Sequence, residues 1–276
     1  MRRFTCVFAY LTGRLGPLSS AAQFPANSRA WEAIMDQTMP ILLVPGLASS
    51  ARIYAPVIPS LWRFGPVMVA NHIRDDSMAA IARRVLSEAP PRFALAGHSM
   101  GGYIALEIMR QAPERVARLA LINTQARPDT EEATARRRGL MERARRGELR
   151  AAREEMFPEL VHPSRRDDAG IRQLVHEQGE DVGVEGYLRQ QTAIIARVDS
   201  RPTLATIKCP TLVLTGDADN TIPNALSKEM AEGIAGARLV VLEDCGHLPQ
   251  PEQPAATVRA LVEWLGPPVV SGPRTA

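Results

Sequence analysis

The segment Gly97-His98-Ser99-Met100-Gly101-Gly102 has the residue types needed for nucleophilic attack by a hydroxyl group. An apolar run at 92–96, typical of a strand, precedes it, and an amphipathic run at 101–111, typical of a helix, follows it. In a sharp strand-to-helix turn, glycines two residues to either side leave room for the serine at the tip. The free N–H groups of the following helix favour a developing oxyanion there. The segment therefore predicts Ser99 as a nucleophile. The alternative is a glycine-rich turn whose serine has no catalytic role.

A serine hydroxyl needs a base within hydrogen-bond reach and a third group that orients the base. We predict His247 as the base, because it follows the strand expected at 238–242 on an irregular loop, where catalytic groups concentrate. Two aspartates, Asp217 and Asp219, follow the strand expected at 211–214. Asp219 lies further past the strand end, where a side chain reaches the rim of the sheet. We therefore predict Asp219 as the orienting acid and Asp217 as a turn residue.

The other histidines are placed less well for this role. His72 ends an early strand, and His162 and His176 lie in a charged stretch poor in strand signals. His98 adjoins the serine, but its position in the turn points it away from the hydroxyl. We expect His98 to pack beside the turn.

Attack on a carbonyl also requires donors for the oxyanion, usually two backbone N–H groups. One predicted donor is the amide of Met100, directly after the nucleophile. The other is the amide of Leu47 in Pro45-Gly46-Leu47, the loop after the strand expected at 41–44. Gly46 would let the backbone turn towards the serine.

The elements that must position these residues alternate between strand and helix. Apolar runs predict strands at 41–44, 66–70, 92–96, 116–122, 211–214 and 238–242, and periodic runs predict helices at 52–62, 75–88, 101–111, 225–234 and 257–265. Such alternation implies a mostly parallel sheet with helices on both faces. Residues 39–126 and 207–266 are therefore expected to form one α/β core.

The alternation stops over residues 127–206, which are too long for a plain loop and predict a helical cap. This stretch holds fifteen arginines and fifteen acidic residues, so Arg136–Arg138 and Arg145–Arg146 are expected to be solvated surface charge. Phe157 and Tyr187 are candidate walls of a substrate pocket, with ordinary packing inside the cap as the alternative.

Composition excludes several other classes of protein. The net charge of +3 is too small and diffuse for a nucleic-acid footprint, and no run is apolar enough to span a membrane. Three cysteines without paired spacing argue against a disulfide framework or a zinc site. We expect a small-molecule substrate, no metal and no organic cofactor; nothing in the sequence indicates an oligomeric state.

The two ends of the chain are expected to lie outside the fold. Residues 1–38 are interpreted as a disordered extension or an over-long start, with Met35 or Met39 as the first residue, and residues 267–276 as a loose tail. Free thiols favour a cytoplasmic location. A signal or transit peptide within residues 1–34 is the alternative, although Gly13 and Arg14 interrupt its apolar segment.

The pattern resembles the α/β-hydrolase superfamily over about residues 40–265. The matching segments are Val44-Pro45-Gly46-Leu47, the turn at 97–102, Gly216 to Pro223, and Gly246-His247 with Glu252-Gln253-Pro254 close behind. Members commonly place the acid third after the glycine of a G-x-x-D segment, which corresponds to Asp219. Two features depart from the family: Pro45 stands where members often have a histidine, and two early strands have no counterpart before Pro40. The resemblance therefore implies the α/β-hydrolase fold with a sheet of about six strands.

The resemblance is greatest to small, cap-bearing bacterial esterases, lactonases and carbon–carbon bond hydrolases. It implies a serine hydrolase that forms an acyl-enzyme on a small carboxylic ester, with a lactone or a carbon–carbon bond as the alternative substrate. A serine at position 99 argues against the related dehalogenases, which use an aspartate. A hydrolase-like ligand receptor with slow turnover also stays open, and a scaffold used only for association is disfavoured by the complete set of three residues.

Overall fold

The computed structural model of the chain describes residues 38–267. The expectations for residues 1–37 and 268–276 therefore lie outside the described residues. No helix within the described range is both long and apolar enough to cross a membrane.

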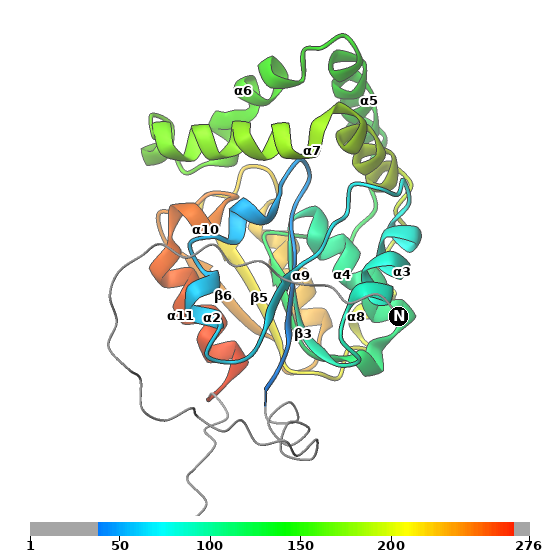
Figure 1. The fold of residues 1–276 in the computed structure, drawn as a ribbon, viewed down its shortest axis with the longest axis vertical. Helices are drawn as coiled ribbons and strands as arrows, with labels where there is room; N and C mark the ends of the chain where they lie inside the picture. Colours follow the sequence, from blue (N-terminus) through cyan, green and yellow to red (C-terminus); the bar gives the residue numbers. More distant parts are fainter. Residues whose placement is uncertain (1–37, 268–276) are drawn as a thin grey trace, which may run out of the picture. The chain divides into compact units, whose positions relative to one another are not determined.

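The described chain contains one sheet of six parallel strands in the order β2-β1-β3-β4-β5-β6 (Figure 1). The strands are β1 (Ile41–Val44), β2 (Val67–Val69), β3 (Phe93–His98), β4 (Val116–Ile122), β5 (Thr211–Gly216) and β6 (Arg238–Leu242). This confirms the predicted α/β-hydrolase sheet. Because every strand runs in the same direction, the loops that follow the strands meet at one edge of the sheet.

Alternate side chains of β1 to β5 enter two hydrophobic cores, one on each face of the sheet, whereas Leu239 and Val241 of the edge strand β6 are exposed. Leu42 and Val44 of β1 pack in the core covered by α3 and α4, whereas Ile41 and Leu43 pack in the core covered by α11. The helices of these layers are η1 (Ala51–Tyr54), α2 (Ile58–Leu61), α3 (Met78–Glu88), α4 (Met100–Gln111), η2 (Pro113–Arg115), α9 (Asn224–Gly233), α10 (Pro249–Glu252) and α11 (Pro254–Leu265).

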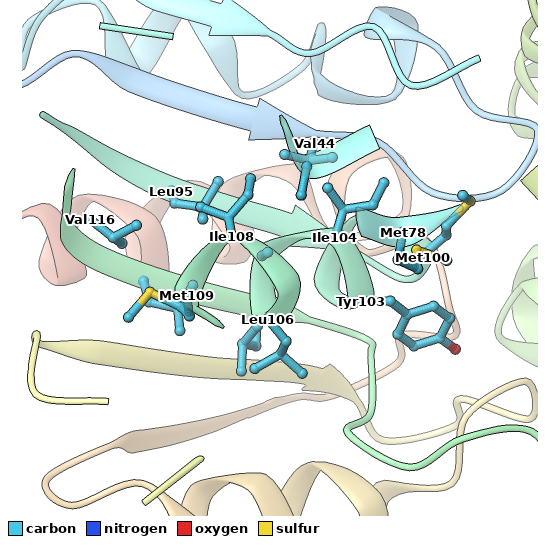
Figure 2. Close-up of a cluster of buried hydrophobic side chains, with 14 of the residues drawn as sticks. Val44, Met78, Leu95, Met100, Tyr103, Ile104, Leu106, Ile108, Met109 and Val116 are labelled. Atoms are coloured by element: carbon cyan, nitrogen blue, oxygen red, sulfur yellow. The ribbon is translucent and has the colours of Figure 1, made fainter. Parts of the chain in front are cut away.

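The helix α4 is the most deeply packed of these elements. Every residue from Met100 to Met109 is buried, and Figure 2 shows Ile104 and Ile108 of this helix beside Val44 and Leu95 of the sheet. Burial on all sides fixes the N-terminus of α4, and with it the turn that begins at Ser99.

The segment expected at 52–62 as one helix is two short helices, η1 and α2. Pro56 has no N–H group to continue the hydrogen-bond ladder, and Ala55 donates back to Arg52 instead. The single-helix prediction is wrong for this reason.

A helical segment connects β4 to β5. It contains α5 (Glu131–Arg145), α6 (Leu149–Leu160), η3 (Pro163–Arg165), α7 (Ala169–Ile195) and α8 (Arg201–Leu204). We call residues 127–206 the cap. Two features shape and attach it: α7 bends at Gly183, where φ is 67°, and Arg52 of η1 pairs with Asp181 of α7 at 2.8 Å. In Figure 1, α5, α6 and α7 lie together at one end of the α/β core.

Candidate active site

The turn between β3 and α4 holds Ser99 in a backbone conformation that few non-glycine residues adopt, with φ 53° and ψ −117°. A Cβ atom at Gly97 would clash with the backbone of Gly101, and one at Gly101 would clash with the carbonyl oxygen of Val44. The turn therefore requires glycine at both positions. Its register is fixed because the Ser99 amide donates to the carbonyl of Ile122, at 2.9 Å.

The structure brings Ser99, His247 and Asp219 together at the carboxyl edge of the sheet. His247 Nε2 lies 2.9 Å from Ser99 Oγ, and His247 Nδ1 lies 2.9 Å from Asp219 Oδ2. A carboxylate only accepts hydrogen bonds, so Nδ1 carries the proton and Nε2 is left to accept from the serine hydroxyl. His247 and Asp219 are buried, while Ser99 is partly exposed. This arrangement can deprotonate Ser99 as it attacks.

The carboxylate of Asp219 is held from several directions. Its Oδ1 accepts from the amides of Thr221 and Ile222, both at 2.9 Å, and its Oδ2 accepts from Asn123 Nδ2 at 2.9 Å. Burial alone would raise the pKa of Asp219, but the electrostatic interaction with His247 and these hydrogen bonds outweigh it and hold the pKa below its usual value. Sequence reasoning missed Asn123, which follows β4 with a φ of 43°.

Asp217 has a different task on the same edge of the sheet. Its carboxylate accepts from the backbone amides of Asp244 and Cys245, at 3.2 and 3.0 Å. These residues belong to the loop that carries His247. Asp217 therefore ties the two loops together, while Asp219 contacts the imidazole.

Glu252 supports the backbone on both sides of His247, a role that the sequence did not indicate. Its Oε2 accepts from the amide of Gly246 at 3.0 Å, and its Oε1 accepts from that of Leu248 at 2.9 Å. Oε2 also accepts from the amide of His162 in the cap, at 2.7 Å. Burial raises the pKa of Glu252 despite these bonds. The only available signal was its position shortly after the histidine.

The cap also holds the main chain of His247 directly. The His247 amide donates to the carbonyl of Leu160, the last residue of α6, at 2.9 Å. On the other side, the imidazole of His98 lies 2.8 Å from the His247 carbonyl oxygen through Nε2. Burial lowers the pKa of His98 to about 3, so this ring is neutral and donates to that carbonyl. His98 thus contacts the main chain of His247 and does not reach the serine.

The two predicted oxyanion donors lie on neighbouring segments. The ends of β1 and β3 are paired, Val44 with Gly97, which brings the loop at 45–47 beside the turn. Gly46 packs so close that an added Cβ would lie 3.2 Å from Ser99 Cβ. Within residues 38–267, the amides of Leu47 and Met100 have no hydrogen-bond acceptor. Both donors are therefore available to a ligand beside Ser99.

The loop at 45–47 is held by the segment that follows β2 and by the cap. His72 Nε2 lies 2.9 Å from the carbonyl oxygen of Gly46, and Gln190 of α7 accepts from the amide of Ala48 at 2.9 Å. Burial lowers the pKa of His72 to about 4, so its ring is neutral. These contacts give His72 a supporting place beside the site.

A cavity of about 250 Å³ opens beside Ser99 and His247, between the sheet edge and the cap. Tyr187 lies in its wall, as does Leu47. Phe157 does not: it is buried in the core on the α11 face of the sheet, with the guanidinium of Arg172 over its ring at 4.3 Å. Its position on α6 turns it inward, so the structure does not bring it to the cavity.

Most of the cap arginines lie where they were expected. The exposed ones are Arg136, Arg138, Arg145 and Arg146. Arg136 pairs with Glu159 at 2.8 Å where the cavity meets the surface. Arg137 is the exception: it lines the cavity, its side chain is 21% exposed, and it pairs with Asp129 at 2.7 Å. The expectation was wrong for Arg137 because its side of α5 faces the cavity. In residues 38–267, no group of three or more His, Cys, Asp or Glu side chains is arranged to hold a metal ion.

Known proteins match the chain along most of its length. A protein of Azorhizobium caulinodans named putative carbamate hydrolase RutD is 31% identical over 232 residues, covering 75% of this chain and 84% of that protein. A pimeloyl-(acyl-carrier protein) methyl ester esterase of Aeromonas hydrophila is 25% identical, covering 81% of this chain and 89% of that protein.

Solved structures of hydrolases also superpose on most of the chain. A thermophilic esterase from Thermogutta terrifontis superposes with a TM-score of 0.75 at 31% identity, covering 83% of this chain and 90% of that one. An enol-lactonase from Burkholderia xenovorans superposes with a TM-score of 0.74 at 25% identity, covering 83% and 92%. The model of the alpha/beta hydrolase family matches residues 18–260. The chain therefore belongs to the alpha/beta hydrolase family.

Proposed function

We propose that this hydrolase acts on a small carboxylic ester through an acyl-enzyme formed on Ser99. One observation carries the proposal: the Ser99 hydroxyl, the His247 imidazole and the Asp219 carboxylate form a continuous hydrogen-bonded chain at the wall of the cavity.

In the first half of the proposed reaction, Ser99 Oγ forms a bond to the ester carbonyl carbon and its proton passes to His247 Nε2. The amides of Leu47 and Met100 donate to the oxyanion, and losing one such donor typically costs about 2.7–4 kcal/mol of barrier. The carbon–oxygen bond to the leaving group then breaks, and the departing alcohol takes the proton from Nε2. Asp219 stabilises the imidazolium throughout and keeps the proton of Nδ1 in place.

In the second half, a water molecule gives a proton to His247 Nε2 and its oxygen attacks the acyl carbon. The bond to Ser99 Oγ breaks, and the serine recovers its proton from the imidazole. The carboxylic acid leaves. The same residues therefore serve both halves, with the imidazole alternating between base and acid.

Carbamate hydrolysis is the second candidate, favoured by the 31% identity to the relative named putative carbamate hydrolase. Lactones are a further candidate, because a solved structure at 25% identity is an enol-lactonase, and a carbon–carbon bond is the alternative that the sequence resemblance implies. All of these substrates offer a carbonyl carbon to the same nucleophile, so the choice between them depends on the cavity.

A fluorophosphonate probe tests the nucleophile. We expect covalent labelling at Ser99 in the wild-type protein and none in Ser99→Ala, read by mass spectrometry of the labelled peptide. Labelling elsewhere, or full labelling of the variant, would contradict the proposal.

Steady-state turnover of a panel of esters, carbamates and lactones then ranks the substrates. We expect Ser99→Ala to lower kcat on an activated ester by about 10⁴-fold or more. A hydrolase-like receptor would instead give a single turnover followed by a persistent ligand complex.

A further inference from the structure

The cap side chain Arg153 lines the cavity beside Ser99. Its Nη2 donates to the carbonyl oxygen of Val175 at 2.8 Å. Among the residues that the structure describes, its buried Nε has no hydrogen-bond partner. Within residues 38–267, no carboxylate pairs with this guanidinium. Burying a charged group away from water costs free energy unless an opposite charge or hydrogen-bond acceptors pair with it.

The acidic residues that line the same cavity are already engaged. Asp129 pairs with Arg137 and also with Arg197, the latter at 2.5 Å, and Glu159 pairs with Arg136. None of them is left to neutralise Arg153. Burial lowers the pKa of Arg153 to about 10, which still leaves the guanidinium protonated at neutral pH.

The neighbouring helix is shaped around this guanidinium. An added Cβ at Gly179 of α7 would lie 2.8 Å from Arg153 Nε and 3.2 Å from its Cδ. The absence of a side chain at Gly179 thus makes room for the arginine between α6 and α7. The carbonyl of Val175, one turn earlier, accepts from Nη2, and Nε packs against Gly179. The donors left for a ligand are therefore those of Nη1 and the second hydrogen of Nη2.

We propose that Arg153 binds a carboxylate on the substrate, at the end remote from the bond that Ser99 attacks. This inference rests on the proposed function and narrows its substrate class to acidic half-esters. A planar guanidinium matches a carboxylate in a two-point hydrogen bond. Leu140 and Met156, which line the same cavity, would contact the short carbon chain between the two ends.

Two methyl esters of matched length test the proposal: monomethyl glutarate, which carries a carboxylate, and methyl pentanoate, which carries a methyl group in its place. The measured quantity is the ratio of their kcat/KM values, with products followed by NMR. We expect Arg153→Met to lower the acidic-to-neutral ratio by about 10- to 100-fold, the effect of one charge-assisted contact. Arg153→Lys, which keeps the charge and is less disruptive to folding, should lower it by about 3- to 10-fold because the two-point contact is lost.

Arg150 provides the matched control on the same helix. It lies three residues earlier and pairs at the surface with Glu180, and its side chain is 68% exposed. Arg150→Met should leave the ratio at the wild-type value. A wild-type ratio in both Arg153 variants, or an equal fall in Arg150→Met, would overturn the proposal.

Calorimetric binding separates this inference from the proposed function. Ser99→Ala should bind monomethyl glutarate about 10- to 100-fold more tightly than Ser99→Ala/Arg153→Met does. If wild type hydrolyses neither ester but this difference in Kd is found, the proposed function fails and the carboxylate site stands. If wild type hydrolyses methyl pentanoate and the two Kd values are equal, the carboxylate site fails and the proposed function stands.

Discussion

On the sheet side of the cavity, the Asp219 carboxylate accepts hydrogen bonds from His247, Asn123 and two backbone amides. On the cap side, the Arg153 guanidinium donates to a single carbonyl within residues 38–267. Both groups are charged, and both lie at or near the same cavity. The difference is that the hydrogen-bonding capacity of the Asp219 carboxylate is filled by the chain, whereas most donors of the Arg153 guanidinium are left without a partner among the described residues.

This difference separates two functions of a buried charge. A group that orients the base must keep the same position through the whole reaction. Several hydrogen bonds that hold it in that position are therefore an advantage. A group that recognises a ligand must exchange its partner at every turnover, so the chain leaves its hydrogen bonds unfilled. Variants on the two sides should therefore fail in different ways.

The largest expected effect is on the sheet side, in Asp219→Asn. The amide no longer holds the Nδ1 proton of His247, so we expect kcat on a neutral activated ester to fall by about 10³- to 10⁴-fold. Asp217→Asn is the matched control, because the Asp217 carboxylate accepts from backbone amides of the neighbouring loop and not from His247. A larger loss in Asp217→Asn than in Asp219→Asn would reverse the assignment of the acid.

A smaller effect is expected in Glu252→Gln. The new amide nitrogen would face a backbone N–H where the carboxylate now accepts, which leaves a buried donor unpaired. We expect the free energy of unfolding to fall by about 1–3 kcal/mol in denaturant titrations. We also expect kcat to fall about tenfold, because the backbone around His247 loses an anchor. Unchanged stability and unchanged kcat would show that the three amides do not depend on this carboxylate.

The smallest effect is expected on the cap side, in Gly179→Ala. Alanine stabilises a helix relative to glycine, so the free energy of unfolding should not fall. The new methyl group nevertheless displaces Arg153, and the acidic-to-neutral ratio of kcat/KM for the two methyl esters should fall by about 2- to 10-fold. A ratio that stays at the wild-type value would indicate that the guanidinium does not depend on the space at Gly179.

The sheet side could be predicted from the sequence because its signals are local. The turn around Ser99 requires glycines at fixed offsets, and the apolar runs mark strands whose carboxyl ends share one edge. The position of Asp219 past its strand was also readable. Asn123 and Glu252 escaped prediction because their roles depend on which distant amides and side chains the fold brings to them.

The cap side could be predicted only as helical. Its arginines and acids are equal in number, which favours a solvated surface, and composition alone cannot tell which face of a helix turns inward. Arg137 faces the cavity in an ion pair, whereas Arg153 faces it with no ion pair to any described residue. That distinction depends on tertiary contacts with α7 and with the segment before α5.

The hydrogen bond from the His247 amide to the carbonyl of Leu160 has a consequence for access to the site. Glu252 reinforces it by joining the amides on both sides of His247 to that of His162, at the same end of α6. If the cap moved away from the α/β core at this end, it would pull the imidazole away from Ser99. A substrate that enters while the imidazole stays in place must therefore pass another part of the cavity edge. The C-terminal end of α6 is then the part of the cap that stays fixed.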